Sequence, residues 1–504
     1  MNRDSAMPTA TSGPPATTGT RRPLAALVDP AIRLEVLDAA ALDDLHAATL
    51  ELIETIGVRF PSARAQAIWA DHGARVDPVT GIVRVPGHVI DAALRLAPAA
   101  FTLAGRDLDR DLPLDGHHIW AATDGCGVEV ADLATGERRR STLDDVTAIC
   151  RVAEELPDVG FIWMPVSAQD VAPETRALRE LAAALSITTK HVQTESVMHA
   201  REAAVAVEMA LALAGGDSAL RQRPPLSLTF CTISPLAHEA GALDAALVAA
   251  EAGIPTGFMT MASCAHTGPA TLAGTLAVGN AEVLSALALV ELAFPGAPVY
   301  YAAAQTAMDL RTGAYTGGGP EDVLFGLASG ELADRYQLPL SMGAFATGAH
   351  VPDWRAGLEN GLATLAACVG RADMLLGMGL LAGSRIWSYQ QLLLDAEIMG
   401  LVRGICRGIP VDAESLALDV IRGVGPGGDY LAEAHTRRHM RERWSPALID
   451  RRPPSPDGTP RVDALERAHQ RALELFATAP GAPLDPALAA ELVRIAETAG
   501  EPGR

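Results

Sequence analysis

Eight short apolar segments, each followed by an Ala- and Leu-rich stretch of helical character, alternate along residues 117–406. Short apolar runs bounded by turn residues are typical of buried strands, and a helix between successive strands is the usual connection in a parallel sheet. Eight such units predict an α/β fold, a closed (β/α)8 barrel of the TIM type. A doubly wound open sheet is the competing architecture. The predicted strands are 117–124, 159–165, 189–195, 226–233, 255–261, 298–304, 338–343 and 373–379.

The rest of the chain predicts additions to this barrel. Residues 1–30 are rich in Thr, Pro and Ser and are expected to form a disordered tail. Residues 31–116 predict an N-terminal α+β segment with a hairpin around Thr80-Gly81. The barrel is expected over residues 117–409, and residues 410–504 should form a mostly helical extension packed on it.

Charge and cysteine content exclude several classes of protein. The chain has 504 residues and a formal net charge of −21, which argues against a surface that binds nucleic acid. Its six cysteines form no C-x-x-C pair, and several lie in apolar runs, which is typical of reduced thiols in a cytoplasmic protein. The first residues contain no apolar core of a secretory signal, and no membrane association is expected.

Two kinds of reactive site receive little support. Lys190, the single lysine, suggests a Schiff base, but it lies at the start of its predicted strand, away from the end where barrel chemistry occurs. His435 and His439 have i, i+4 spacing, and Cys264 and His266 form a possible pair, but no third ligand is evident for either. The sequence therefore predicts no tightly bound metal.

The carboxyl ends of the predicted strands, where barrel enzymes place their chemistry, carry acids, amides and aromatics rather than nucleophiles. Asp124 and Glu195 are two of the acids. Aromatic rings at a barrel mouth form a cage for a cation such as a quaternary ammonium, although each ring has the alternative of packing a loop onto the barrel. The aromatics at or just past strand ends are Trp163, Phe345, Trp354, Trp387 and Tyr389.

Several long segments resemble the trimethylamine methyltransferase family. The resemblance covers roughly residues 35–450 and implies a barrel enzyme that moves a methyl group from a methylamine to the cobalt of a corrinoid carried by a separate protein. The segments that carry it are "SPL" (234–236), "TGPATLAGTLAVGNAEVL" (267–284), "PGAPVYY" (295–301), "AMDLRTGAYTGGGPEDVL" (307–324), "LADRYQLPLSMG" (332–343) and "VGPGGDYLAEAHTRRHMRERW" (424–444).

One departure from the family pattern narrows the expected donor. The resemblance implies that the trimethylamine enzymes of methanogens carry pyrrolysine, with its electrophilic imine, at the tip of the seventh strand. Residues 343–348 read Gly-Ala-Phe-Ala-Thr-Gly and contain no such group. The chain therefore resembles the non-pyrrolysine branch of this methanogenesis-related family, which includes glycine betaine methyltransferases, and the expected donor is glycine betaine or a similar quaternary amine.

The expected site is a substrate pocket without an assigned catalytic side chain, because Co(I) attacks the methyl group directly. We expect His350, Arg385 or backbone N–H groups at a helix start to bind the carboxylate of a betaine. The corrinoid should arrive on a partner protein, since the chain has no D-x-H-x-x-G carrier motif, and a homo-oligomer is expected. The residues predicted to bind the substrate are Glu195, Gln305, Phe345, His350, Arg385, Trp387 and Tyr389.

Two alternatives to this function remain open at the level of the sequence. One keeps the fold and the reaction but uses another methyl donor, such as a trimethylamine-like or a sulfonium compound. The other is a non-catalytic homologue that binds the corrinoid protein without turnover. The sequence does not identify the donor, the corrinoid partner or the number of subunits.

Overall fold

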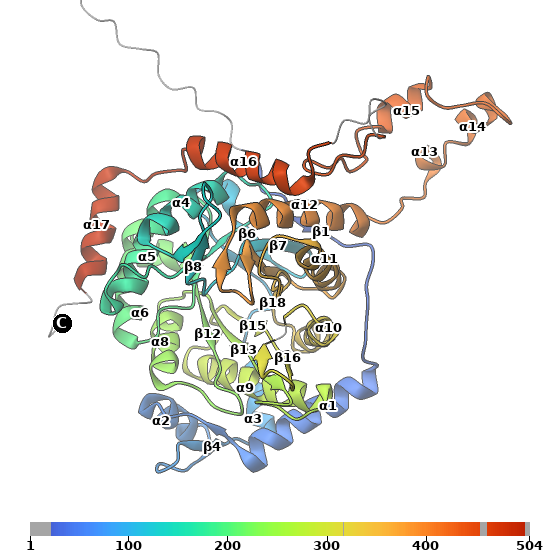
Figure 1. Cartoon of the computed structure of the whole chain (residues 1–504). Coiled ribbons are helices and arrows are strands. Elements are labelled where there is room, and N and C mark those ends of the chain that lie inside the picture. The colour runs from blue at the N-terminus through green and yellow to red at the C-terminus, as the bar shows by residue number, and fades with distance from the viewer. Residues whose placement is uncertain (1–21, 316, 454–460, 499–504) are drawn as a thin grey trace, which may run out of the picture.

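The computed structural model describes residues 22–315, 317–453 and 461–498, and it confirms the predicted barrel (Figure 1). Eight strands lie side by side and parallel in one sheet, and a bridge between Ala122 and Phe161 joins the first strand to the second and closes the ring. The first 21 residues of the predicted tail lie outside the described residues. In chain order the barrel strands are β7 (His118–Thr123), β10 (Ile162–Trp163), β11 (Val192–Thr194), β12 (Leu226–Cys231), β13 (Thr256–Thr260), β15 (Val299–Ala303), β18 (Leu340–Gly343) and β19 (Met374–Met378).

A helix follows each barrel strand, and the sequence marks several helix starts. Asp353 accepts a hydrogen bond from the N–H of Ala356, and Ser388 accepts one from Gln391, as N-cap residues do. Pro320 occupies the first position of its helix, where it has no N–H to leave unpaired. The barrel helices are α4 (Leu143–Glu154), α5 (Pro173–Ile187), α6 (Ala200–Ala214), α8 (Ala240–Glu251), α9 (Leu272–Ala293), α10 (Pro320–Tyr336), α11 (Trp354–Val369) and α12 (Tyr389–Cys406).

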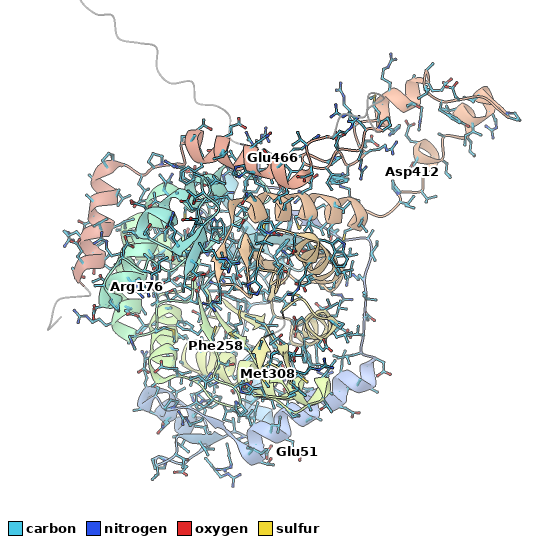
Figure 2. The ribbon with its side chains drawn as sticks, in the orientation of Figure 1. Glu51, Arg176, Phe258, Met308, Asp412 and Glu466 are labelled. Carbon is cyan, nitrogen blue, oxygen red and sulfur yellow. The ribbon has the colours of Figure 1, made fainter. Side chains whose placement is uncertain are left out.

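Side chains along each strand alternate between the inside of the barrel and the layer beneath the helices. Tyr300 belongs to the inner cluster, and its hydroxyl lies 2.6 Å from that of Thr229, whereas Tyr301 belongs to the outer core. Phe258 lies in the same outer core, among the densely packed side chains between sheet and helices (Figure 2). This alternation decides which residues at the strand ends face the barrel axis.

Helix α9 is the most apolar helix of the barrel. Among the described residues it is the only helix that is long and apolar enough to cross a membrane. However, 89% of its most apolar window is buried inside the protein. It packs between β13 on one side and the N-terminal helices α1 (Ala39–Glu51) and α3 (Gly87–Leu94) on the other. Its apolar character is therefore explained by its central position.

The N-terminal segment attaches to the barrel in two places. Strand β1 (Leu27–Val28) pairs antiparallel with the start of β7, at the amino-terminal face of the barrel. The remainder packs outside α9 and contains the predicted hairpin around Gly81. Its further elements are η1 (Leu52–Ile56), β2 (Val58–Arg59), α2 (Ala63–Asp71), β3 (Arg75–Val76), β4 (Ile82–Arg84), β5 (Phe101–Leu103), η2 (Leu108–Arg110) and β6 (Leu112–Leu114).

Short strands in the loops after the barrel strands build two small sheets over its carboxyl-terminal face. One sheet has the order β20-β21-β8-β9 and the other has the order β14-β16-β17, and helix α7 (Asp217–Gln222) follows α6. The bounds of these strands are β8 (Glu129–Ala131), β9 (Arg138–Arg140), β14 (Ser263–Cys264), β16 (Thr306–Asp309), β17 (Ala314–Tyr315), β20 (Leu380–Leu381) and β21 (Ile386–Trp387).

After α12 the chain leaves the barrel, projects into solvent and returns (Figure 1). We call residues 409–443 the arm. It contains α13 (Ala413–Leu416), α14 (Leu418–Val424) and α15 (Ala434–His439), and it ends where Trp444 lies against Gly400 and Gly404 of α12. Two further helices, α16 (Ala464–Thr478) and α17 (Pro486–Glu497), then pack on the outside of the barrel.

Candidate functional site

The loops after β7 and β11 meet the end of β10 at the carboxyl-terminal face of the barrel, which we call the mouth. Glu195 directly follows β11, and the Sγ of Cys126 donates a hydrogen bond to its Oε1 at 3.3 Å. Trp163, the last residue of β10, lies on the same side. A Cβ on Gly125 would lie only 2.8 Å from both carboxylate oxygens of Glu195 and from Cε2 of Trp163. Only glycine therefore lets the loop after β7 approach this carboxylate and this indole so closely.

The carboxylate of Glu195 has no cationic partner. In the part of the chain that the structure describes, no Lys, Arg or His forms an ion pair with Glu195 or Asp124, and the Oε2 of Glu195 is buried without a hydrogen bond. Burial raises the pKa of Glu195, against the opposing effect of the nearby Cys126 thiol and Trp163 indole. A buried carboxylate oxygen without a partner is costly, so the mouth favours a ligand that carries positive charge.

Cys126 is not an activated nucleophile. The negative charge of the adjacent Glu195 raises the pKa of its thiol above the ordinary range, although Cys126 is exposed. Burial, followed by the charge of Glu195, raises the pKa of Cys231, at the end of β12, to about 12. The thiolate is the reactive form of cysteine, and a raised pKa keeps both side chains in the thiol form. They therefore line the site as uncharged groups and do not act as nucleophiles.

Asp124, beside Glu195, is held by a strained loop. Ser384 donates a hydrogen bond to its carboxylate, and the N–H of Gly125 donates another at 2.9 Å. Burial raises the pKa of Asp124 to about 7. Ala382 and Ser384 have φ angles of 55° and 62°, in the left-handed region that non-glycine residues adopt at a cost of roughly 1 kcal/mol each. Such strain persists only where the surroundings impose it.

The turn at the tip of β18 supplies that constraint. The N–H of Ala382 donates to the carbonyl of Ala349 at 2.7 Å, and the N–H of Gly383 donates to that of Thr347 at 3.0 Å. The hydroxyl of Thr347 in turn donates to Glu359 of α11 at 2.6 Å. The small residues of this turn therefore bring two backbones together and fix the loop that carries Ser384.

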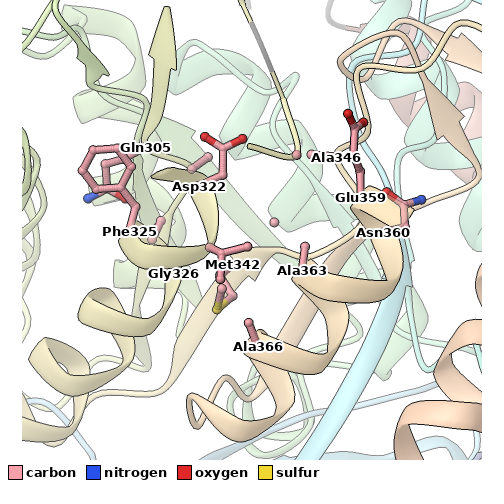
Figure 3. Close-up of a pocket in the computed structure, with 15 residues that line it drawn as sticks. Gln305, Asp322, Phe325, Gly326, Met342, Ala346, Glu359, Asn360, Ala363 and Ala366 are labelled. Atoms are coloured by element: carbon pink, nitrogen blue, oxygen red, sulfur yellow. The ribbon is translucent and has the colours of Figure 1, made fainter. Parts of the chain in front are cut away.

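A second, separate cavity of about 50 Å³ lies behind β18, between α10 and α11 (Figure 3). Gln305, Asp322 and Asn360 line it, and within the described residues both amide atoms of Gln305, the Oδ1 of Asp322 and the Oδ1 of Asn360 make no hydrogen bond. A cavity of this size has room for about three or four waters. Its lining combines these polar groups with apolar side chains such as Phe325 and Met342.

The structure separates the residues that the sequence predicts to lie together. Glu195 lies at the mouth, whereas Gln305 points outward beside Gly279 of α9 and into the second cavity. The reason is the two-residue period of strands: Gln305 is two positions after Ala303, which faces the outer core, so it faces outward too. The prediction that Gln305 lies beside Glu195 is therefore wrong.

Trp387 and Tyr389 do not form an open aromatic cage, because both side chains are buried. Trp387 is fully buried against Gly379, and its ring meets that of Tyr389 edge-on at 5.8 Å. Tyr389 continues the contact to Phe476 of α16 at 5.5 Å. Both rings belong to the apolar layer between the barrel and the outer helices. Both rings therefore fit the alternative of an aromatic residue that packs a loop onto the barrel, and their predicted role in substrate binding stays a prediction.

The remaining predicted residues lie around the β18 tip and the rim. Phe345 is fully buried against the backbone of Gly377, and it does not present its ring to the mouth. His350 and Arg385 are exposed on the rim. The backbone carbonyl of His350 accepts a hydrogen bond from Arg138, and that of Arg385 accepts one from the N–H of Val128. Their side chains are exposed to solvent.

The sequence alone does not show which strand-end residues meet. It places Trp163 and Asp124 at strand ends without joining them in one site, and it does not distinguish Gly125 or Cys126 from their neighbours. The signal that identifies them is their position: they end or directly follow β7 and β10, which are neighbours in the closed ring, and Glu195 directly follows the next strand, β11.

The structure also settles the other candidate positions. Lys190 is buried at the start of β11, where its Nζ donates to the carbonyls of Ala153 and Leu156, and burial lowers its pKa to about 7.

His435 and His439 do have a third possible ligand: Glu414 of α13 lies with them, and its Oε1 is 3.1 Å from Nε2 of His439. The expectation that no third ligand accompanies these histidines is therefore wrong. The cluster lies on the arm, away from the mouth.

Comparison with known proteins gives consistent matches along nearly the whole chain. The family described as trimethylamine methyltransferase matches residues 9–498. The trimethylamine methyltransferase of Desulfitobacterium hafniense is 33% identical over 454 residues, 90% of this chain and 91% of that protein. The trimethylamine methyltransferase of Methanosarcina barkeri is 32% identical over 432 residues, 83% of this chain and 86% of that protein.

Two further matches bear on donor class and fold. The glycine betaine methyltransferase of D. hafniense is 30% identical over 466 residues, 91% of this chain and 96% of that protein. The crystal structure of the M. barkeri monomethylamine methyltransferase superposes with a TM-score of 0.52 at 11% identity, and the match covers 89% of each chain. At that identity the structural likeness supports the barrel fold alone.

Proposed function

Because this chain belongs to the trimethylamine methyltransferase family and is a methyltransferase, we propose that it moves a methyl group from a quaternary amine, glycine betaine or a close analogue, to Co(I) of a corrinoid carried by a separate protein. One feature of the chain supports a quaternary donor over a tertiary one. The tip of β18, residues 343–348, carries no electrophilic side chain that could activate a tertiary amine.

The single observation that carries the proposal is the carboxyl group of Glu195, which has no cationic partner among the described residues and lies beside the indole of Trp163. A quaternary ammonium has no N–H to donate, so its recognition depends on aromatic faces and on negative charge. A cation over a tryptophan ring gains roughly 0.5–2 kcal/mol. A carboxylate that is buried and unpaired gains more from a cation than an exposed one does, because less solvent screens it.

The chemistry of the donor explains why the site needs no acid or base. The bond from nitrogen to one methyl carbon breaks while the bond from that carbon to the acceptor forms, and the electron pair stays on nitrogen. A quaternary ammonium leaves in this way as a neutral amine, with no proton transferred. The protein contributes alignment and the exclusion of water. An uncharged Cys126 suits that task, and so does Asp124, whose pKa burial raises to about 7.

In this proposal the acceptor is a second protein substrate that reaches the mouth. The loops around the mouth would then form the surface that receives it. If the donor is a betaine, its carboxylate would point to the rim, where the side chains of His350 and Arg385 are exposed. Gln305, Trp387 and Tyr389 receive no role in binding the ammonium group.

The test is methyl transfer from a panel of donors to reduced cobalamin, followed by the absorbance of the cobalt. We expect activity with glycine betaine or another betaine and little with trimethylamine. A sulfonium donor that outperforms every quaternary amine would keep the reaction and change the donor. Activity with trimethylamine alone would contradict the quaternary-amine proposal.

A further inference from the structure

The arm, residues 409–443, has no core of its own. None of its residues is buried, and its side chains, Asp412 among them, stand in solvent away from the body (Figure 2). Short helices without a buried face are marginal in water, and small segments without a core are commonly held together by disulfides or by a metal ion. The arm contains no cysteine. Of these two means, only a metal ion is therefore available within the arm.

Three side chains with the chemistry of metal ligands meet in the arm. His435 and His439 lie one turn apart on α15, so their rings share one side of the helix, with centroids 4.3 Å apart. Glu414 of α13 approaches from 21 positions before His435, and its Oε1 lies 3.1 Å from Nε2 of His439. One ligand atom from each of the three residues lies within 4.8 Å of the other two. The cluster therefore joins the first helix of the arm to the last (Figure 1).

The separations suit one tetrahedral ion. Zn²⁺ holds an imidazole nitrogen or a carboxylate oxygen at about 2.0–2.2 Å, so two of its ligand atoms lie roughly 3.3 Å apart. Glu414 and His439 already have a separation close to this. All three side chains are at least partly exposed, so His435 can reach the same ion by rotation of its side chain. Two imidazoles and one carboxylate, with water in the fourth position, are a ligand set that zinc uses.

The carboxylate of Glu442 supports the histidine that lies nearest Glu414. Its Oε2 lies 2.8 Å from Nδ1 of His439, whose other nitrogen, Nε2, faces Glu414. A metal-bound histidine almost always donates its second N–H to a carboxylate or a carbonyl, and this hydrogen bond leaves the other nitrogen free to bind the metal. Similarly, the Nε2 of His435 lies 3.2 Å from the backbone carbonyl of Glu414. When Nε2 donates to that carbonyl, Nδ1 carries the free lone pair.

Ion pairs account for only part of this cluster. Arg438 donates to the Oε1 of Glu414 at 3.0 Å, and His439 lies between the carboxylates of Glu414 and Glu442. His435, in contrast, forms no ion pair with any described residue, although its ring lies against that of His439. Exposed ion pairs stabilise little, because solvent screens them, whereas the free energy of metal binding adds directly to that of folding. Glu414 has two carboxylate oxygens, so Arg438 can stay bound to one while the other holds a metal ion.

We propose that Glu414, His435 and His439 bind a divalent transition-metal ion of the zinc type, which joins α13 to α15 and orders the arm. The ion has a structural role, because the cluster lies away from the mouth, and the inference is independent of the identity of the methyl donor. It departs from the expectation of no tightly bound metal, which depended on the lack of a third ligand for the two histidines.

The first test measures the binding of Zn²⁺ and Co²⁺ to the full chain after treatment with EDTA and removal of the chelator. Tetrahedral Co²⁺ has a characteristic visible absorbance, and Zn²⁺ should displace it from the same site. We expect His439→Ala and Glu414→Gln each to lower the affinity for Zn²⁺ about 100-fold or more, because each removes a ligand. Glu442→Gln should lower it about 10- to 100-fold, the range for a residue that orients a ligand. His72→Ala, at an exposed histidine that ends α2, is the matched control and should bind Zn²⁺ as the wild type does.

The second test measures hydrogen exchange of the backbone amides with and without Zn²⁺. Zn²⁺ should slow the exchange of α13 and α15 in the wild type and in His72→Ala, but not in His439→Ala. The barrel helices should exchange equally in all of these proteins, which verifies that each remains folded. A wild type that binds no Zn²⁺, or an affinity that His439→Ala and Glu414→Gln leave unchanged, would overturn the proposal. So would exchange of the arm that does not respond to Zn²⁺, and ion pairs alone would then explain the cluster.

Discussion

Ser384 donates a hydrogen bond to the carboxylate of Asp124 across 260 positions of the chain, and it does so from a left-handed backbone conformation. This contact joins the loop after the last barrel strand to the loop after the first. The strain at Ala382 and Ser384 is maintained by hydrogen bonds to the turn at the tip of β18. Hydrogen bonds thus link the three loops that border the mouth to one another.

Asp124→Asn should reveal the burial of this carboxyl group as a pH effect on stability. Burial raises the pKa of Asp124 to about 7, so between about pH 4 and pH 7 the folded protein keeps a proton that the unfolded chain has lost. As pH rises through this window the wild type loses stability that the asparagine variant keeps. Between pH 4 and pH 7, the free energy of unfolding of the variant should therefore rise relative to that of the wild type. The rise is at most about 4 kcal/mol, at ~1.4 kcal/mol per pKa unit. Denaturation of both proteins from pH 4 to pH 8 measures it, and a constant difference would contradict the assignment.

Glu195→Gln should weaken the use of a quaternary donor without unfolding the protein, because the amide keeps the shape and removes the charge. We expect kcat/KM for the donor to fall about 10- to 100-fold, the range for loss of a charged partner. The KM for the methyl acceptor should not change. Glu251→Gln on α8, in a surface ion pair with Arg64, is the control and should behave as wild type. Unchanged donor kinetics in Glu195→Gln would remove Glu195 from the site.

Gly125→Ala should damage the mouth by geometry alone. The added Cβ would lie 2.8 Å from the Glu195 oxygens and from Trp163, so both must move. A misplacement of this kind costs on the order of 100-fold in kcat/KM. Gly357→Ala on α11, where a Cβ meets no atom within 4 Å, is the matched control and should retain activity with equal or higher stability. Wild-type activity in Gly125→Ala would show that the close approach is dispensable.

Chelation should leave methyl transfer unchanged. The cluster of Glu414, His435 and His439 that has the residue types of a metal site lies on the arm, and the mouth holds no comparable group among the described residues. We expect equal rates before and after treatment with EDTA and removal of the chelator. His439→Ala should likewise keep the donor kcat/KM. Loss of activity on chelation, restored by zinc, would overturn this expectation.

The barrel was predictable because its determinants are local and repeated. Apolar runs such as 226–233 and 298–304, the cap at Asp353 and Pro320 at a helix start each specify one element, and eight repeats leave few topologies. Which strand-end residues meet was harder to predict. The inward or outward direction of Gln305 depends on the register of β15, and the packing of Tyr389 depends on Phe476 of α16, far away in the sequence. Long-range packing of this kind leaves no periodic signal.

Helix α16 lies where the first barrel helix, α4, meets the last, α12. Arg151 of α4 donates to the carbonyl of Phe476, and His469 lies 3.0 Å from the amide of Gln390 on α12. These contacts lie outside the seam where the first and last barrel strands, β7 and β19, pair directly. In the order of synthesis, a nascent chain therefore carries every strand of the ring before it carries α16, and the contacts that α16 adds across this seam are the last to be made available to the folding chain.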